Sequence, residues 1–342
     1  MSRLGVLPQD KLRSAGRLTA VFTSLTLAGC AAEGAPAAFR PQGPAARQIN
    51  DLWWILFALG AATFVLVVGI LLVALFRQRS PELTLRHSGR SGRFLVWGGG
   101  VFYPLIILAV TYGFTFHTLR QLAVPEEAGQ PVVEVIGHQW WWEVRYPEQE
   151  VITANEIYTP TGETVLLRLS SADVIHSFWV PQLHGKMDLI PGRTNTWQLQ
   201  ADEPGAYWGL CAEFCGTQHA KMLFLVVAVP PAEYERWLAA RRAPAPSPTD
   251  PVAQDGLAVF LETGCGECHA IRGTEAVGDL GPDLTHIASR LTLGAGAVRN
   301  NRGNLAGWIA DPHGIKPGNL MPTTEITGPE LQALLAYMET LE

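Results

Sequence analysis

Soft metal ligands gather in one short segment of the chain. Cys211, Cys215, His219 and Met222 fall within twelve residues, and His176 precedes Cys211 by thirty-five. Two thiols, two imidazoles and a thioether favour copper over magnesium or calcium. A single-copper electron-transfer site needs one cysteine, two histidines and a weak axial methionine, which leaves one thiol over. Two bridging thiolates would instead hold two copper ions, each completed by one histidine and one weaker ligand.

Two other uses of these side chains stay open from the residues alone. A disulfide between Cys211 and Cys215 suits an oxidising compartment. A closed Cys2His2 zinc site would add His176 and His219. Neither alternative gives Met222 a role at its spacing. The copper interpretation uses all of these side chains and predicts a coloured electron-transfer centre.

A second group of ligands follows in Cys265-Gly-Glu-Cys268-His269. Cys-x-x-Cys-His is the attachment signature of haem c, in which two thioethers hold the porphyrin and the histidine ligates the iron. The later Gly-Pro282-Asp-Leu resembles the class I cytochrome c segment whose proline carbonyl orients that histidine. The sequence therefore predicts one covalent haem c on Cys265 and Cys268, with His269 as an axial ligand.

The sixth iron ligand is expected from the Asn-Leu-Met321-Pro segment, because Met321 follows His269 by fifty-two residues. Met338 is the rival, but it lies in an apolar closing helix predicted over Leu331–Leu341. We therefore expect Met338 in the core. A His/Met pair raises the haem potential, as suits a carrier near the top of a respiratory chain.

Two apolar segments must anchor these centres to a membrane. Leu52–Phe76 and Phe94–Phe116 carry no charge, and each exceeds the ~20 residues that a bilayer core requires. The segment between the two spans and its edge carry five arginines against one glutamate: Arg77, Arg79, Arg86, Arg90, Arg93 and Glu82. Basic loops stay in the cytoplasm. The spans therefore predict a transmembrane hairpin within residues 30–116 and place residues 117–342 outside.

The N-terminus has the features of an export signal. Four basic residues precede a twelve-residue apolar stretch from Leu18 to Gly29, too short to span a bilayer. The ending Leu27-Ala-Gly-Cys30 resembles a bacterial lipobox. We expect residues 1–29 to be a lipoprotein-type signal peptide and Cys30 to be lipidated. A free cysteine in an uncleaved leader is the alternative.

The exported part reads as two domains joined by a connector. Residues 117–242 show short β-type runs and then an amphipathic helix over Pro231–Arg242, which predicts an antiparallel sandwich or barrel. The strands expected are Val132–Ile136, Thr164–Leu169, Thr196–Leu199 and Leu223–Val229. The proline-rich residues 243–251 predict a semi-rigid tether. Residues 252–342 predict an all-α class I cytochrome c domain.

Charge is distributed unevenly along the chain. Residues 1–93 hold eleven Lys and Arg against four Asp and Glu, whereas residues 94–342 hold fourteen against twenty-seven. Within residues 250–342 the balance is twelve acids to five bases. An acidic surface attracts basic partners. A small basic cytochrome c is therefore the expected outside donor, and turnover should depend on salt.

The stretch around the first group of ligands resembles cytochrome c oxidase subunit II. The likeness runs through Gly137-His-Gln-Trp140-Trp-Trp, Asp173-Val-Ile-His176-Ser-Phe and Ile190-Pro-Gly-Arg to Met222. It covers roughly residues 50–240 and includes both membrane spans. It implies a cupredoxin-like fold for residues 117–242, between the hairpin and the cytochrome c domain.

The resemblance also implies roles for individual residues. The ligands of a dinuclear copper A centre would be His176, Cys211, Cys215, His219, Met222 and the backbone carbonyl of Glu213. The Glu213 carboxylate would reach a magnesium ion at the boundary with subunit I. Trp140 would be where an electron arrives from a cytochrome. Core packing or an interfacial belt is the alternative for the three tryptophans, and we expect it for at least one.

A cytochrome c domain fused after this subunit resembles subunit II of caa3-type oxidases. The resemblance implies that electrons pass from an external donor to haem c, copper A and haem a in subunit I, where O2 is reduced to water with proton translocation. Expected partners are subunits I and III and, as donor, a cytochrome c or a bc1-type complex, with no nucleic acid. The chain is expected in the bacterial plasma membrane, with both redox domains on the outer face.

One departure from the family and three alternatives bear on this interpretation. The family often has a glutamate just before the second span, at a proton path, but residues 91–97 contain no acid. That role is not carried over. A copper chaperone or sensor would not place His176 before the cysteines or need a haem domain. A quinol oxidase subunit would lack the copper ligands, and a nitric-oxide-reducing complex would share them.

Overall fold

The structure, a computed structural model, describes residues 37–76, 90–123 and 130–342. The expected signal peptide and Cys30 lie outside the described residues, as does most of the arginine-rich loop between the two spans.

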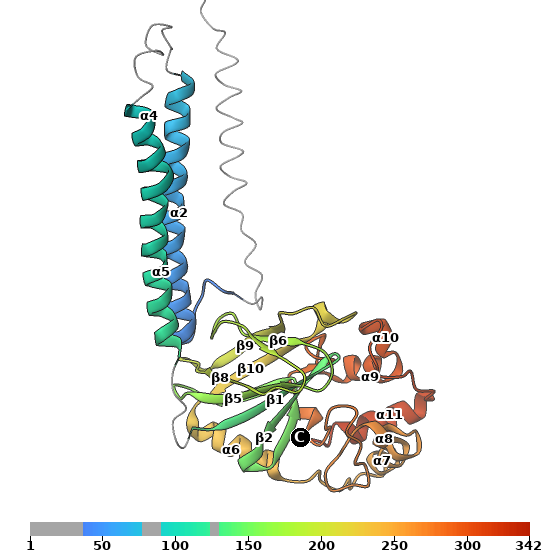
Figure 1. The fold of residues 1–342 in the computed structure, drawn as a ribbon. Helices are drawn as coiled ribbons and strands as arrows, with labels where there is room; N and C mark the ends of the chain where they lie inside the picture. Colours follow the sequence, from blue (N-terminus) through green and yellow to red (C-terminus); the bar gives the residue numbers. More distant parts are fainter. Residues whose placement is uncertain (1–36, 77–89, 124–129) are drawn as a thin grey trace, which may run out of the picture. The chain divides into compact units, whose positions relative to one another are not determined.

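Two long apolar helical segments form the N-terminal part. Helix α2 spans Pro44–Phe76, and the second segment runs through α4 (Arg90–Phe94), the π-helix η1 (Leu95–Phe102) and α5 (Tyr103–Leu122). Both are long and apolar enough to cross a membrane. The hydroxyl groups of Thr63 and Tyr103 lie 2.8 Å apart and link the helices, which run side by side in Figure 1. Each helix extends beyond the predicted span.

The next domain is a sandwich of two five-stranded sheets. One sheet has the order β3-β2-β1-β5-β8 and the other β4-β10-β9-β6-β7 (Figure 1). The strands of the first sheet are β1 (Val132–His138), β2 (Trp141–Tyr146), β3 (Val151–Ala154), β5 (Val165–Ser171) and β8 (Asn195–Leu199). Those of the second are β4 (Glu156–Pro160), β6 (His176–Trp179), β7 (Met187–Leu189), β9 (Gly205–Cys211) and β10 (Leu223–Val229).

The sandwich differs from the expected antiparallel pattern in one pairing of each sheet. Strand β1 pairs with β5 in parallel, and β10 pairs with β4 in parallel. Parallel neighbours need a crossover connection, and here the chain passes through the other sheet between the partners. The remaining pairs are antiparallel, so the sandwich itself is as predicted.

Alternating burial along the strands builds the core between the sheets. Strand β1 alternates half-buried and buried residues, as a strand with one covered face does. Trp142, Phe178 and Phe224 are almost completely buried and meet at the centre, with ring centroids of Phe178 and Phe224 4.6 Å apart. Helix α6 (Pro231–Arg242) closes the sandwich, and Trp237 stacks on Tyr158 at 4.3 Å.

Hydrogen bonds hold the connector against the cytochrome c domain. The backbone N–H of Ala245 donates to the Arg272 carbonyl at 2.8 Å, and the His286 ring lies 3.2 Å from the Ala243 carbonyl. Asp250 then caps α7 by accepting from the Ala253 N–H at 3.1 Å. Proline content predicts a stiff connector, and these contacts with distant residues restrict it further.

The last domain is helical, with α7 (Pro251–Glu262) packed against α11 (Gly328–Met338). Gly256 allows the close approach, since a Cβ there would lie 2.0 Å from the Ala333 carbonyl oxygen. A capping box of Thr327 and Glu330 begins α11. Between them lie α8 (Cys265–Cys268), α9 (Arg302–Ala310), α10 (Pro312–Ile315) and the short strands β11 (Thr292–Leu293) and β12 (Val298–Arg299).

Candidate metal centre and haem attachment segment

The predicted copper ligands meet because two strand pairings bring them to one end of the sandwich. Cys211 ends β9, and the antiparallel partner β10 begins directly after Met222, so the ligand loop joins two neighbouring strands. His176 begins β6, whose residue Phe178 is paired with Cys211. The register therefore places His176 beside the loop despite the distance in sequence.

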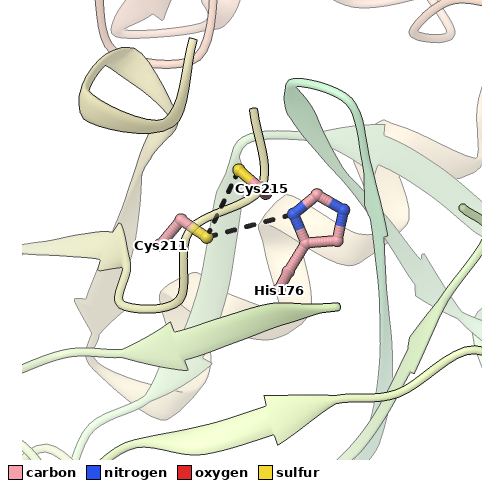
Figure 2. A group of neighbouring side chains, drawn as sticks. All are labelled: His176, Cys211 and Cys215. Carbon is pink, nitrogen blue, oxygen red and sulfur yellow. Dashed lines mark hydrogen bonds between the residues drawn. The ribbon is translucent and has the colours of Figure 1, made fainter. Parts of the chain in front are cut away.

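The two thiols lie at the centre of this group. Figure 2 shows Cys211 Sγ between the Sγ atom of Cys215, at 3.8 Å, and Nδ1 of His176, at 3.9 Å. On the other side, Cys215 Sγ lies 3.7 Å from Nδ1 of His219 and 3.8 Å from Sδ of Met222. The structure thus brings all five predicted side chains together.

These distances suit metal ligands rather than a disulfide. A disulfide has a sulfur–sulfur distance of about 2.05 Å, and both cysteines are free here. Two ligands about 2.3 Å from a shared ion lie about 3.8 Å apart at the tetrahedral angle. His176, Cys211 and Cys215 present ligand atoms within 4.8 Å of one another, and His219 is not part of that group. The arrangement therefore has a thiol pair in the middle with one imidazole at each end.

The backbone carbonyl and the side-chain carboxylate of Glu213 face different partners. Its backbone carbonyl accepts from the Cys211 thiol at 3.1 Å, which places a weak oxygen donor beside the thiol pair. Its half-exposed carboxylate lies 3.9 Å from the Lys186 ammonium. In the described part of the chain, Glu213 belongs to no group of three or more His, Cys, Asp or Glu residues whose ligand atoms lie close enough together to hold a metal ion. A magnesium ion on this carboxylate would need ligands from elsewhere.

Protonation of the site is set by the contact between its thiols. The hydrogen bond between them lowers the pKa of Cys211 and raises that of Cys215, while burial raises both. Burial lowers the pKa of His176, but hydrogen bonds to Cys211 and Asp173 outweigh it and raise the net value. The pair is therefore ready to lose one proton easily, and a cation would have to displace the second.

Two residues that the sequence interpretation did not single out position His176. Asp173 Oδ1 lies 2.8 Å from Nε2 of the ring, which leaves Nδ1 facing the thiols. Gly137 lies under the ring, because a Cβ there would come within 2.7 Å of its Cδ2 atom. Both residues belong to the segments that resemble the family, but neither residue type at its position indicated a contact with the His176 ring.

The three tryptophans have different surroundings. Trp142 is fully buried in the core, so the packing alternative holds for it, and Trp141 stacks on His138 at 4.4 Å. The half-buried Trp140 instead donates from Nε1 to the Cys215 carbonyl at 3.0 Å. The Gln139 side-chain amide donates to the same oxygen at 2.7 Å. Of the three, Trp140 is the one bonded directly to the ligand loop.

The predicted haem attachment segment begins with a short helix. Cys265 and Cys268 bound the short helix α8, and neither forms a disulfide. Nδ1 of the adjacent His269 lies 2.8 Å from the Pro282 carbonyl, so this nitrogen carries the proton and Nε2 is left for a metal. Burial lowers the pKa of His269 and keeps the ring neutral, the state that binds iron.

The surroundings of the predicted axial ligands fit a large apolar group. Val277, Leu280 and Leu320 are 81%, 75% and 72% exposed, unusual for aliphatic side chains of a packed domain. All three lie in the segments that follow Cys268 or precede Met321. Met321 is half-buried, and its role stays a prediction, whereas Met338 is buried in the core as expected.

Comparisons with known proteins agree with this geometry. Residues 149–229 match the family described as cytochrome c oxidase subunit II, periplasmic domain, and residues 253–342 match cytochrome c. A cytochrome c oxidase subunit 2 from Alkalihalophilus pseudofirmus is 36% identical over 328 residues, which cover 94% of this chain and 95% of that protein. The chain belongs to the cytochrome c oxidase subunit 2 family.

Other members are similar over much of the chain. Cytochrome c oxidase subunit 2 from Bacillus sp. strain PS3 is 33% identical over 78% of this chain and 80% of that protein. Among solved structures, the periplasmic domain of subunit II from Bradyrhizobium japonicum is 28% identical, with a TM-score of 0.33, and covers 35% of this chain and 96% of that one.

The family accounts for the architecture described above. As a cytochrome c oxidase subunit 2, the chain is part of a haem-copper oxidase, and its fused cytochrome c domain fits the caa3-type arrangement. The subunit 2 domain implies copper A, for which the Cys and His cluster is suited, and the cytochrome c domain implies haem c.

Proposed function

We propose that this chain is the electron-accepting subunit of a haem-copper terminal oxidase. It takes electrons from an external donor at its own haem c, passes them to copper A and on to haem a in subunit I, where O2 is reduced to water with proton translocation. The observation that carries the proposal is the pair of free thiols 3.8 Å apart, flanked by one imidazole at each end, in a chain that also holds the haem attachment segment.

In this proposal the copper A ligands are His176, Cys211, Cys215, His219, Met222 and the Glu213 carbonyl. When bound, the copper pair supplies a one-electron acceptor whose charge is shared between two ions. The thiols of Cys211 and Cys215 would hold the pair, Asp173 and Gly137 orient His176, and the Trp140 and Gln139 side chains hold the Cys215 carbonyl. A rigid site changes little on reduction, which favours fast transfer.

Cys265 and Cys268 would hold the haem covalently, and His269 and Met321 would ligate its iron. His269 is oriented by the Pro282 carbonyl, and its neutral ring matches the charge state that iron requires. A His/Met pair gives a high potential, which suits a donor close to the terminal acceptor. Electron transfer between the domains forms and breaks no bond in the chain.

The finer assignments belong to the same proposal. Subunits I and III are the membrane partners, a basic cytochrome c or a bc1-type complex is the donor, and the Glu213 carboxylate contributes to a magnesium site facing subunit I. The chain resides in the bacterial inner membrane with both redox domains on the periplasmic face. Residues 1–29 form a signal peptide and Cys30 is lipidated.

The proposal is tested on the full chain purified from membranes with its partners. We expect an electron spin resonance spectrum of one electron delocalised over two copper ions, a covalent haem c band, and reduction of haem c before copper when reduced cytochrome c is added. A colourless, zinc-loaded chain would refute the copper assignment. Measuring oxygen uptake against nitric oxide reduction in the complex identifies the terminal acceptor.

A further inference from the structure

The cytochrome c domain contacts the ligand loop of the copper domain through one short segment. The Lys316 ammonium donates to the Trp140 carbonyl at 2.8 Å. The Gln218 side-chain amide donates to the Pro317 carbonyl, and Lys221 donates to the Ile315 carbonyl at 2.8 Å. Residues 315–317 therefore lie against Trp140 and the segment that carries His219.

Lys316 is the unusual member of this contact because its charge is buried. The residue is 3% exposed, and its ammonium also donates to the Gly294 carbonyl of its own domain at 3.0 Å. A buried ammonium is costly unless its hydrogen bonds are made. One of the two acceptors found here belongs to the other domain, so burial of Lys316 is compensated only when the domains are docked. Lys316 therefore specifies one docked orientation, the one that brings both acceptors to its ammonium.

Glu156 forms a second contact of opposite polarity. This carboxylate of β4 is 2% exposed and accepts from the backbone N–H groups of Leu291 and Thr292, at 2.6 and 3.1 Å. Here the copper domain supplies the charge and the cytochrome domain supplies the partners. The positive charge of Arg290 acts favourably on the same carboxylate. Each domain therefore buries one charge that the other satisfies.

Backbone contacts close the space between these two charges. The Leu223 N–H donates to the Ala295 carbonyl at 3.0 Å. Gly296 lies so close that a Cβ there would reach 2.7 Å from the Leu223 Cβ and 3.0 Å from the Trp208 ring. The contact is continuous from β4 and β10 to the ligand loop, which fixes the orientation of the cytochrome domain and not only its distance.

The position of Lys316 links this contact to the redox sites. Lys316 precedes the predicted haem ligand Met321 by five residues. Its acceptor Trp140 donates through the indole to the Cys215 carbonyl at 3.0 Å. One lysine thus joins the predicted iron-ligand segment to a predicted copper ligand through a single residue.

We propose that Lys316 is a positioning residue that holds the cytochrome c domain on the Trp140 face of the copper domain. Trp140 then receives electrons from the chain's own haem domain rather than from an outside cytochrome. This inference rests on the proposed function. One electron leaves the reduced haem domain and one is gained by the oxidised copper site, with no proton or bond change, and a reduced external cytochrome restores the haem.

The test compares Lys316→Met with Arg299→Met in the full, metal-loaded complex. Methionine keeps an unbranched apolar side chain of similar size but removes the charge and donors of the lysine. Arg299 is an exposed base of the same domain, so its variant controls for lost positive charge. The first readout is enhancement of copper spin relaxation by the ferric haem, which reports their proximity without turnover. The second is the rate of copper reduction after a flash reduces the haem.

For Lys316→Met we expect the equilibrium constant for docking to fall by about tenfold, the effect of losing one charged hydrogen bond, and the haem-to-copper rate to fall with it. Arg299→Met should match the unaltered chain. We also expect an outside reduced cytochrome to gain direct access to copper in Lys316→Met. Unchanged relaxation and rate in Lys316→Met would overturn the proposal.

Two controls separate the possible failures. If the unaltered chain lacks the copper or haem spectrum, the proposed function fails, whereas spectra that are present with docking unaffected by Lys316→Met refute only the positioning role. If Lys316→Met does not fold, Glu156→Gln tests the docked arrangement through the other buried charge. Loss of relaxation enhancement with intact spectra supports the arrangement, and its retention contradicts it.

Discussion

Asp173 Oδ1 lies 2.8 Å from Nε2 of His176, while the other ring nitrogen faces the Cys211 thiol. A carboxylate on the outer nitrogen fixes the tautomer and orientation of a metal-binding imidazole, and its loss typically costs about 10–100-fold in metal affinity. Asp173→Ala should therefore weaken copper retention by that factor. Competition with a chelator measures it, and the exposed Glu148 offers a control in Glu148→Ala, which should bind copper normally.

Gly137→Ala should disturb the same histidine from its other side. The added methyl would lie 2.7 Å from the His176 ring, so the ring or the strand must move, at a cost of about 1–3 kcal/mol in unfolding free energy. Thermal unfolding and copper content measure the two effects. Gly205→Ala is the control, because its nearest neighbours stand at 3.5 Å. Equal behaviour of the two variants would contradict the close contact.

Met321→Ala should leave the haem attached but abolish low-spin methionine ligation. Attachment depends on Cys265 and Cys268, whereas the spin state depends on the sixth ligand. The visible and near-infrared spectra report the ligation, and denaturing electrophoresis with haem staining reports the attachment. Met338→Leu preserves core volume and should keep the native spectrum. An unaltered spectrum in Met321→Ala would refute the assignment.

His184 should make the copper domain less stable in acid. Burial lowers the pKa of His184 to about 4, and its Nδ1 accepts from the Gly185 N–H at 2.7 Å. In the unfolded chain the ring has a pKa of about 6.5. The free energy of unfolding is therefore at its full value above that pH and falls as the pH drops toward 4, by up to about 3 kcal/mol.

Denaturant unfolding between pH 7 and pH 4 measures this loss. The variant His184→Gln cannot bind the proton, so its stability should fall less steeply over the same interval, whatever its stability at pH 7. Parallel pH profiles for the two chains would show that His184 is protonated equally in both states.

Turnover with a basic external cytochrome c should fall steeply as salt is added. Residues 250–342 carry twelve acids against five bases, and salt at 0.1 M largely screens the attraction between exposed charges that are more than about 10 Å apart. Steady-state oxidation of the cytochrome at increasing ionic strength tests this, with the flash-induced haem-to-copper rate as the control. That internal rate should stay constant, and salt-independent turnover would count against a basic donor.

Local patterns predicted some elements almost to the residue. Leu223–Val229 and Pro231–Arg242 have the predicted bounds, because a β-branched run and a proline at the start of a helix act within a few residues. The thiol cluster was also predictable, since ligand types and spacing carry the signal. The bounds of these two elements and the spacing of the two thiols do not depend on distant parts of the chain.

Long-range contacts were not predictable in the same way. The parallel pairing of β1 with β5 depends on how the chain crosses between sheets. Lys316 looks like a surface lysine in the sequence, and only the docked Trp140 carbonyl explains its burial. The hydrogen bond from the Ala245 N–H to the Arg272 carbonyl, which holds the connector, was likewise not predictable from the sequence.

The contact between Gly256 of α7 and Ala333 of α11 has a consequence for the order of events during synthesis. The two helices complete each other's packing, but α11 leaves the ribosome long after α7. The cysteines of α8 therefore emerge while the core around them is still open. The core against which Cys265 packs is completed only when α11 arrives.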